Sequence, residues 1–388
     1  MKEDRKIIIL KIGGSSITNK AQEETLNEEA LDWFAKLVAS SVNPLFLSSD
    51  YRVDKDSNEI NLKPQFIIVH GAGSFGHHSA KRYNLRCGKA AFLEESDYQN
   101  HPHNPTKRRK RDSLSCEAKA IAIELMQNMK RYQMQGLSKT RQSVQKLNAA
   151  TVSCLIKHGV NAVGISPGMS FHRLRAHGAT GLNGKAPNDC MGDDSPRGMQ
   201  DLCESIKHTL QAGLVPVVHG DACMLYDGKR AGILGGDTIA EGLATLWNEG
   251  TSSEKRNSKI SQVIFITDVA GVFSSDPKSN NNAQLIRSLK VNKVTGDVAI
   301  ESKECDGHKK GLGEVDALNV SGSSHAHDVT GGLKAKLGAA VAIVQVGIDV
   351  IISQCGSDST EQFVNGDFNS VWDVEAGTLL SQQTTHSL

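Results

Sequence analysis

The sequence of 388 residues has no surplus of charge of either sign and few aromatic residues. Its formal net charge is +1, and this balance argues against a nucleic-acid-binding protein, which would usually carry a basic surplus. Aromatic residues make up only 5%, whereas glycine, with 36 residues, is abundant. This combination favours an α/β enzyme with many ligand-binding loops over an all-β sandwich.

Cysteine pairs and long hydrophobic runs are also missing. The eight cysteines are scattered and include no Cys-x-x-Cys pair, so neither a secreted disulfide framework nor a structural zinc site is expected. Reduced thiols in a cytoplasmic protein are the simpler interpretation. The apolar run at residues 6–12 is too short for a signal peptide or a transmembrane span, so we expect no association with a membrane.

Three familiar ligand-binding motifs are absent or incomplete. The chain contains no Gly-x-x-x-x-Gly-Lys-Ser/Thr P-loop. Residues 71–76 match Gly-x-Gly-x-x-Gly, but Glu94 and Glu95, the acids near the spacing of a dinucleotide site, follow no strand pattern. Residues 164–168 match the Gly-x-Ser-x-Gly nucleophile elbow in letters, but Pro167 has no amide for an oxyanion hole, which favours a strand-end turn.

The stretch Val69–His78 is the one around which the sequence is organised. The apolar run at residues 66–69 leads into it and predicts a buried strand. Three glycines follow within six residues, and amides in such a turn can approach an anion where a strand ends and a helix begins. His77 directly follows the last of these glycines, where its side chain can meet a bound phosphate. A plain tight turn is the alternative.

A second glycine turn lies near the start of the chain. Residues 6–12 predict a central parallel strand that runs into Gly13-Gly14-Ser15-Ser16. Lys11 lies at the end of this strand, where α/β sheets place their ligands. Burying a lysine costs free energy unless it meets an anion, although a snorkelling surface lysine is the alternative. Lys20, after a polar turn, can reach the same anion.

Strand-like and helix-like patterns alternate along the chain. Further strands are predicted at residues 161–165, 214–219, 263–266 and 349–353, followed by a tail. Helices are predicted at residues 27–42, 115–129, 139–157 and 239–247, and after 327–332, the last carrying Lys334 and Lys336. We therefore expect an α/β three-layer sandwich, with a central, mainly parallel sheet and helices on both faces. Nearly every strand ends in Gly, Asp or Lys, which predicts ligand loops along one edge.

Four polar or glycine-rich segments read as insertions, at residues 48–61, 96–112, 171–197 and 301–325, and residues 291–325 look partly flexible. The second of these segments contains His101, His103 and the basic run Lys107–Arg111. Three interpretations of it are open: a solvated loop, a nuclear-import signal, or a metal site formed by the two histidines. The apolar face from Val144 to Leu155 can pack on the core, line a pocket or meet a partner subunit.

Lysines, glycine turns and carboxylates along one edge suit phosphoryl transfer, in which the protein positions two anions and neutralises the charge between them. On these motifs the chain resembles the isopentenyl phosphate kinases of the amino acid kinase superfamily. The matching segments occur in the family's order and are residues 11–20, 70–77, 220–221, 235–237, 267–273 with 276–277, and 328–336.

The resemblance implies transfer of the ATP γ-phosphate to isopentenyl phosphate. It assigns catalysis to Lys11, Lys20, His77, Asp237 and Lys336. It assigns ATP binding to Lys11, Ile12, Gly13, Gly14, Ser15, Gly73, Gly236, Asp268, Gly332 and Lys336. It assigns acceptor binding to Ala72, Gly73, Gly76, His77, Gly220 and Asp221. The lysines would neutralise the phosphoryl group, Asp237 would orient them, and Mg²⁺ would ride on the ATP phosphates rather than on protein ligands.

The resemblance also implies a single domain over residues 1–388, with an acceptor-binding part at about 1–220 and a nucleotide-binding part at about 221–388. The protein would then bind small-molecule substrates, isopentenyl phosphate and ATP, and neither nucleic acid nor a membrane. It would form a homodimer. A kinase for another phosphate or phosphonate, such as fosfomycin, and a non-catalytic nucleotide-binding regulator are the alternatives. His78 competes with His77 as the acting imidazole; we favour His77, which directly follows Gly76.

Overall fold

The computed structural model describes residues 5–42, 64–85, 116–168, 197–224, 231–247, 258–275, 277, 280–301, 332–367 and 369–383. Of the four segments predicted as insertions, only Arg197 and Glu301 fall inside these ranges. The basic run Lys107–Arg111 lies outside them, and its interpretation as an exposed loop stays a prediction.

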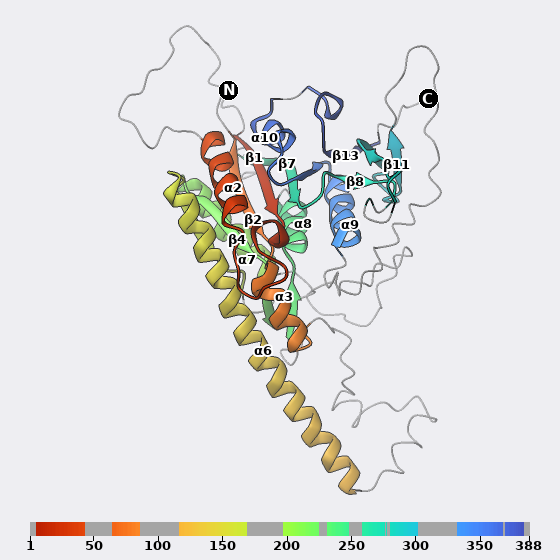
Figure 1. Ribbon diagram of the computed structural model, residues 1–388. Helices are drawn as coiled ribbons and strands as arrows, with labels where there is room; N and C mark the ends of the chain where they lie inside the picture. Colours follow the sequence, from red (N-terminus) through yellow and green to blue (C-terminus); the bar gives the residue numbers. More distant parts are fainter. Residues whose placement is uncertain are drawn as a thin grey trace.

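A nine-strand sheet forms the middle of the molecule (Figure 1), in the order β11-β10-β13-β12-β7-β1-β2-β4-β3. Its strands are β1 (Arg5–Ile12), β2 (Gln65–His70), β3 (Ala162–Ile165), β4 (Val215–His219), β7 (Ser258–Thr267), β10 (Ser288–Val291), β11 (Val298–Glu301), β12 (Asp349–Gln354) and β13 (Thr378–Gln382). The pairs β10–β11 and β12–β13 are antiparallel, and the other pairs are parallel. The predicted α/β fold with a mainly parallel sheet is confirmed.

Helices cover both faces of this sheet, as predicted. On one face lie α7 (Arg197–Gln211), α8 (Gly236–Trp247) and α9 (Gly332–Gln345), which share a hydrophobic core with Ile7 and Ile9 of β1. On the other lie α2 (Glu28–Ser41), α6 (Cys116–Lys157) and α10 (Asp358–Asn365), which share a core with Leu10 and Ile12. Because both faces of the sheet are covered, residues 7–10 of β1 are all apolar and buried rather than alternating with polar residues.

Helix α6 differs from its prediction, because one continuous helix replaces the two expected at 115–129 and 139–157. No proline interrupts the residues between the two predicted helices. Gly136 lies inside the helix, where a Cβ would collide with Tyr83. Val144, Leu147 and Leu155 are buried in the core, which selects core packing from the three alternatives. The start of α6 extends beyond the body of the molecule (Figure 1). In the part of the chain that the structure describes, no helix is long and apolar enough to cross a membrane.

Other corrections concern elements that depend on distant partners. Residues after 353 are not a tail, because they form α10 and then β13, which pairs with β10 and β12 inside the sheet. Of the stretch 291–325 that was expected to be partly flexible, residues 291–301 belong to the hairpin β10–β11 at the sheet edge, and residues 302–325 lie outside the described residues. The pairing of β10 with β13 joins strands far apart in sequence, so no local pattern predicts it.

Two further elements were missed near the middle of the chain. Helix α7 has helical apolar spacing, and its Leu202, Ile206 and Leu210 are buried. It was missed because it directly follows a glycine-rich segment that predicted an irregular insertion. The hairpin of β5 (Asp221–Met224) and β6 (Ala231–Leu234) occupies the residues just before α8. Helix α8 itself begins at Gly236, three residues before the predicted start at Ile239.

The two glycine turns pack directly against each other. They lie after β1, at the start of the short helix α1 (Gly14–Ile17), and after β2, at the start of α3 (Gly73–Arg82). A Cβ on Gly14 would collide with the backbone of Gly73, and one on Gly71 would lie 2.6 Å from the Gly14 nitrogen. Gly73 also has a φ of 51°, which favours glycine. Thr18 ties the turns together, because its hydroxyl donates to the Gly14 carbonyl and accepts from the Ser74 amide.

We expect Gly14→Ala to destabilise the protein by at least about 2 kcal/mol, because the added methyl group meets backbone that cannot rotate away. The matched control is Gly338→Ala in α9, where a Cβ meets nothing within 4 Å and helix propensity should add up to about 1 kcal/mol. Urea unfolding of both variants measures the difference. Equal stabilities would show that the turns are not in close contact.

Candidate active site

Several chain segments converge at the carboxyl-terminal edge of the sheet. Helices α3, α8 and α9 all begin there, and their N-termini favour negative charge. The amide of Gly220, after β4, donates to the His70 carbonyl at 2.9 Å. A Cβ on Gly236 would lie 3.3 Å from both the His70 carbonyl oxygen and the Lys11 Cε. Glycine at position 236 therefore lets the backbone at the start of α8 pass close to the Lys11 side chain.

Two lysines share one carboxylate at this edge. The Lys11 ammonium, from β1, lies 2.5 Å from Asp237 Oδ1. The Lys336 ammonium, from α9, lies 3.1 Å from the same oxygen and 3.3 Å from Oδ2. Both lysines are buried, and both ammonium groups lie over the ring of Phe265, at 5.9 Å and 5.2 Å. The interpretation of Lys11 as a snorkelling surface lysine is therefore excluded.

The charges of this ion triad are unequal, because two ammonium groups face one carboxylate. Burial lowers the pKa of Lys11 to about 8, although Asp237 opposes this effect. Burial alone would raise the pKa of Asp237, but the two lysines together lower it well below its ordinary value. Asp237 thus stays ionised, and the triad carries an excess positive charge that an anionic ligand would neutralise.

Lys20 and Asp268 form a separate, exposed ion pair. Their side chains meet at 2.8 Å, and their exposed fractions are 61% and 44%. Asp268 follows directly after β7, so it lies at the same sheet edge as the triad, but Lys20 does not contact Asp237. The proposed role of Lys20 in neutralising the phosphoryl group stays a prediction that requires its side chain to move.

His77 and His78 lie next to each other in α3, beginning its second turn. His77 is partly exposed. Nε2 of His78 lies 3.1 Å from the carbonyl oxygen of Lys20. The His78 imidazole therefore contacts the segment that follows α1. The role of His77 toward an acceptor stays a prediction.

The remaining predicted residues lie in the turns that surround the triad. Ala72 caps α3, and a Cβ on Gly76 would press on Ala72 and Val144, so Gly76 allows α3 to approach α6. The others are in or beside the first glycine turn or begin α9, namely Ile12, Gly13, Ser15 and Gly332. The Ser16 hydroxyl is buried and has no hydrogen-bond partner among the described residues, so it can donate to a ligand at this turn.

Sequence reasoning gave no role to a buried histidine pair beneath the turns. His70 and His219 end adjacent strands, in register, and their rings stack at 5.9 Å. Nδ1 of His70 lies 3.0 Å from the Gly71 carbonyl oxygen and Nδ1 of His219 lies 3.1 Å from that of Gly220, so the two rings hold the turns that follow β2 and β4. Burial lowers the pKa of both, to about 3 for His219. The repeated Val-His-Gly at the two strand ends was the available signal.

Residues 164–168, which match the nucleophile-elbow motif in sequence, do not form a nucleophile elbow. Ser166 Oγ lies 3.0 Å from Nε2 of His219, as a hydrolase would require. However, an imidazole with such a low pKa is a weak base, and Pro167 offers no amide. This geometry favours the strand-end turn.

Arg141 of α6 is a second residue that sequence reasoning missed. Its guanidinium donates to the buried Asp221 carboxylate at 2.5 Å and to the Pro167 carbonyl at 3.0 Å. Burial raises the pKa of Asp221, and Arg141 opposes that rise. Asp221, predicted to bind the acceptor, thus anchors α6 beside β5. No local pattern singles out Arg141, because the buried face of α6 carries other polar residues, including Thr140, Asn148 and Thr151.

Comparison with known proteins places these features in a family. The model of the amino acid kinase family matches residues 6–354. An isopentenyl phosphate kinase of Arabidopsis thaliana is 26% identical over 396 residues, spanning 96% of this chain and 94% of that protein. One from Methanothermobacter thermautotrophicus is 25% identical over 346 residues, spanning 88% and 89%.

Solved structures share the fold. X-ray structures of isopentenyl phosphate kinase match with a TM-score of 0.53 and 20% identity, covering 97% of this chain and 100% of that one. The product complex of the T. acidophilum isopentenyl phosphate kinase matches with a TM-score of 0.52 and 18% identity, covering 96% and 99%. At these identities, the structural likeness shows the fold alone.

We expect Asp237→Asn to lower stability at pH 7 by about 3 kcal/mol, because it leaves a buried ammonium without its carboxylate. Asp268→Asn is the matched control, since it breaks an exposed ion pair and should cost less than about 1 kcal/mol. Denaturant unfolding measures both changes. If the two variants lose the same stability, Asp237 is not the counter-ion on which the buried lysines depend.

Proposed function

The chain belongs to the amino acid kinase family, and on this premise we propose that it phosphorylates isopentenyl phosphate with ATP. The observation that carries the proposal is the pair of buried lysines on Asp237, at the edge where the glycine turns meet. The choice of acceptor is supported by relatives named isopentenyl phosphate kinase, which align over most of this chain.

In the proposed reaction, a phosphate oxygen of isopentenyl phosphate attacks the γ-phosphorus of ATP. A new P–O bond forms, the bond from the γ-phosphorus to the bridging oxygen breaks, and the electron pair leaves with ADP. The products are isopentenyl diphosphate and ADP. Because both reactants are anions, the protein's task is to hold them in line and to neutralise the charge between them.

In this proposal, Lys11 and Lys336 neutralise the transferred group. Each already has a counter-ion in Asp237, so the ammonium positions are fixed before substrate binds and need little reorganisation. Asp237 is engaged with both lysines, and we therefore expect Mg²⁺ to be held by the ATP phosphate oxygens, as predicted from the resemblance. The first glycine turn and the start of α9, at Gly332, would receive the nucleotide.

The acceptor would lie on the side of the lysines opposite the nucleotide. There it would contact the turn from Ala72 to Gly76, together with His77 and Gly220. The division into an acceptor-binding part at about 1–220 and a nucleotide-binding part at about 221–388 is a further proposal, in which the first glycine turn of the N-terminal part also meets the nucleotide. A cytoplasmic homodimer, implied by the resemblance, is also a proposal. Exposed apolar residues on the projecting part of α6, including Ile121, Leu125 and Met129, offer it a surface, and light scattering of the purified chain tests it.

The function is tested by offering acceptors in parallel and measuring ADP formation. Isopentenyl phosphate, fosfomycin and acetylglutamate, each with Mg²⁺ and ATP, separate the proposed enzyme from its sister kinases. We expect turnover with isopentenyl phosphate at least about tenfold above the others in kcat/KM, equivalent to about 1.4 kcal/mol. A preference for fosfomycin would overturn the substrate, and ATP binding without any turnover would favour a regulator.

The pH profile tests the role of Lys11. Its ammonium must be charged to act, and its pKa of about 8 means that the charge is lost as the pH rises above that value. We expect kcat/KM for ATP to fall about tenfold per pH unit above this pKa. Lys11→Arg should be slower but flat over the same range, because arginine stays charged. Identical alkaline limbs in the two proteins would exclude Lys11 as their cause.

Substitutions at His77 test the acceptor side. A protonated imidazole donating to the acceptor phosphate would contribute about 1.5–3 kcal/mol, so His77→Ala should lower kcat/KM for isopentenyl phosphate by about ten- to a hundredfold. His77→Asn or Gln should recover part of this loss, and ATP binding should survive. His78→Ala is the control. If it is the damaging change and His77→Ala is silent, the assignment is displaced by one residue.

A further inference from the structure

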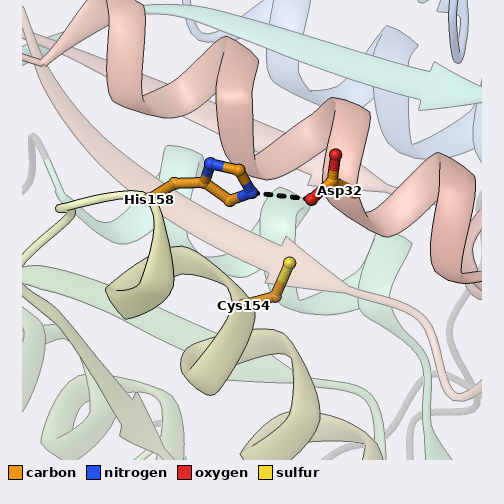
Figure 2. A group of neighbouring side chains, drawn as sticks. All are labelled: Asp32, Cys154 and His158. Atoms are coloured by element: carbon orange, nitrogen blue, oxygen red, sulfur yellow. Dashed lines mark hydrogen bonds and ion pairs between the residues drawn. The ribbon is translucent and has the colours of Figure 1, made fainter.

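Three side chains with metal-ligating atoms meet where α2 passes the end of α6, outside the candidate active site (Figure 2). They are Asp32 of α2, Cys154 of α6 and His158, which directly follows α6. Nε2 of His158 lies 2.7 Å from Asp32 Oδ1. One ligand atom from each of the three residues lies within 4.8 Å of the others, and all three residues are half-buried.

Rigid elements hold these three residues in place. Leu31 and Phe34 of α2 and Leu155 of α6 are buried in the same core, which fixes the two helices against each other. Cys154 and His158 are one helical turn apart, and the amide of His158 donates to the Cys154 carbonyl at 3.2 Å. Their side chains therefore lie on one face of α6, toward α2. His158 lies in the turn that ends α6, and the hydrogen bond of its amide holds it to the last turn of the helix.

The donor set suits zinc better than other common ions. A thiolate, an imidazole and a carboxylate are the protein ligands of Zn²⁺, and bound water can take the fourth tetrahedral position. Ordinary zinc–ligand bonds place neighbouring ligand atoms about 3.3–3.6 Å apart. The His158–Asp32 hydrogen bond is shorter than this, so an ion would replace its proton and part the two side chains slightly. Among the described residues, the Cys154 thiol donates one long hydrogen bond, of 3.8 Å, to the Leu31 carbonyl.

We propose that Asp32, Cys154 and His158 form a binding site for a single Zn²⁺ ion that clamps α2 to the end of α6. The Cys154 thiol loses its proton on binding, and neutral His158 coordinates through Nε2. The thiolate and the carboxylate together balance the charge of the ion. Lys36, which lies 2.8 Å from Asp32 Oδ2, keeps the second carboxylate oxygen. Cysteine spacing pointed away from such a site because its ligands come from separate segments.

Co²⁺ binding to the untagged, full-length, metal-free chain tests the site, because a cobalt–thiolate bond gives a charge-transfer absorption that other ligands do not. We expect one equivalent of Co²⁺ to produce this band and Zn²⁺ to abolish it. Cys154→Ser should lose the band. His158→Gln and Asp32→Asn should weaken binding at least about 100-fold, since even residues behind the ligands commonly contribute 10- to 100-fold. The matched control is Cys355→Ser, which removes another half-buried thiol packed on the same core and should keep the band.

Thermal unfolding gives a second measure that does not rely on cobalt or on kinase activity. One equivalent of Zn²⁺ should raise the melting temperature of the wild-type chain and of Cys355→Ser, but not that of Cys154→Ser. Far-UV circular dichroism establishes that each variant is folded before metal is added. The proposal is overturned if the wild-type chain gives no thiolate band, or if the band persists in Cys154→Ser, which would locate the metal on other cysteines.

Discussion

The structure depends on the attraction between one carboxylate, Asp237, and two buried ammonium groups. Lys11 comes from an inner strand, Lys336 from α9, and Asp237 from the first turn of α8, so the triad joins three elements far apart in the sequence. Without the carboxylate, burial in an apolar strand would drive Lys11 toward its neutral form. With it, positive charge is kept at the edge where a phosphoryl group would be transferred.

The surrounding backbone is shaped so that a ligand can reach this charge. Gly14 and Gly73 bring two strand-end turns into contact, and Gly236 lets the start of α8 pass close to Lys11. Beneath them, His70 and His219 hold the carbonyls of the turns after β2 and β4. Burial lowers the pKa of both imidazoles, so they stay uncharged and add no positive charge to that of the triad. Rigid turns over fixed ammonium groups supply the preorganisation that phosphoryl transfer requires.

Much of this arrangement could be predicted from local pattern, and the rest could not for physical reasons. The apolar run at residues 6–12 and its glycine turn predicted β1 and the importance of Lys11, because a buried lysine is costly without an anion. Strand β13 was missed because long-range pairing, not local preference, makes it a strand. The partners of His70 and Asp221 come from α6, so only the folded chain reveals them. The Asp32–Cys154–His158 cluster was missed for the same reason.

The central claim is that Lys11 and Asp237 act as one unit in phosphoryl transfer, and a double-mutant cycle on kcat tests it most directly. The cycle compares Lys11→Ala, Asp237→Ala and the double variant in single-turnover measurements with ATP and isopentenyl phosphate. Because each residue depends on the other, the double variant should be scarcely slower than the worse single variant, as groups that act together are strongly non-additive. Additive losses would contradict the account, since the two residues would then contribute independently.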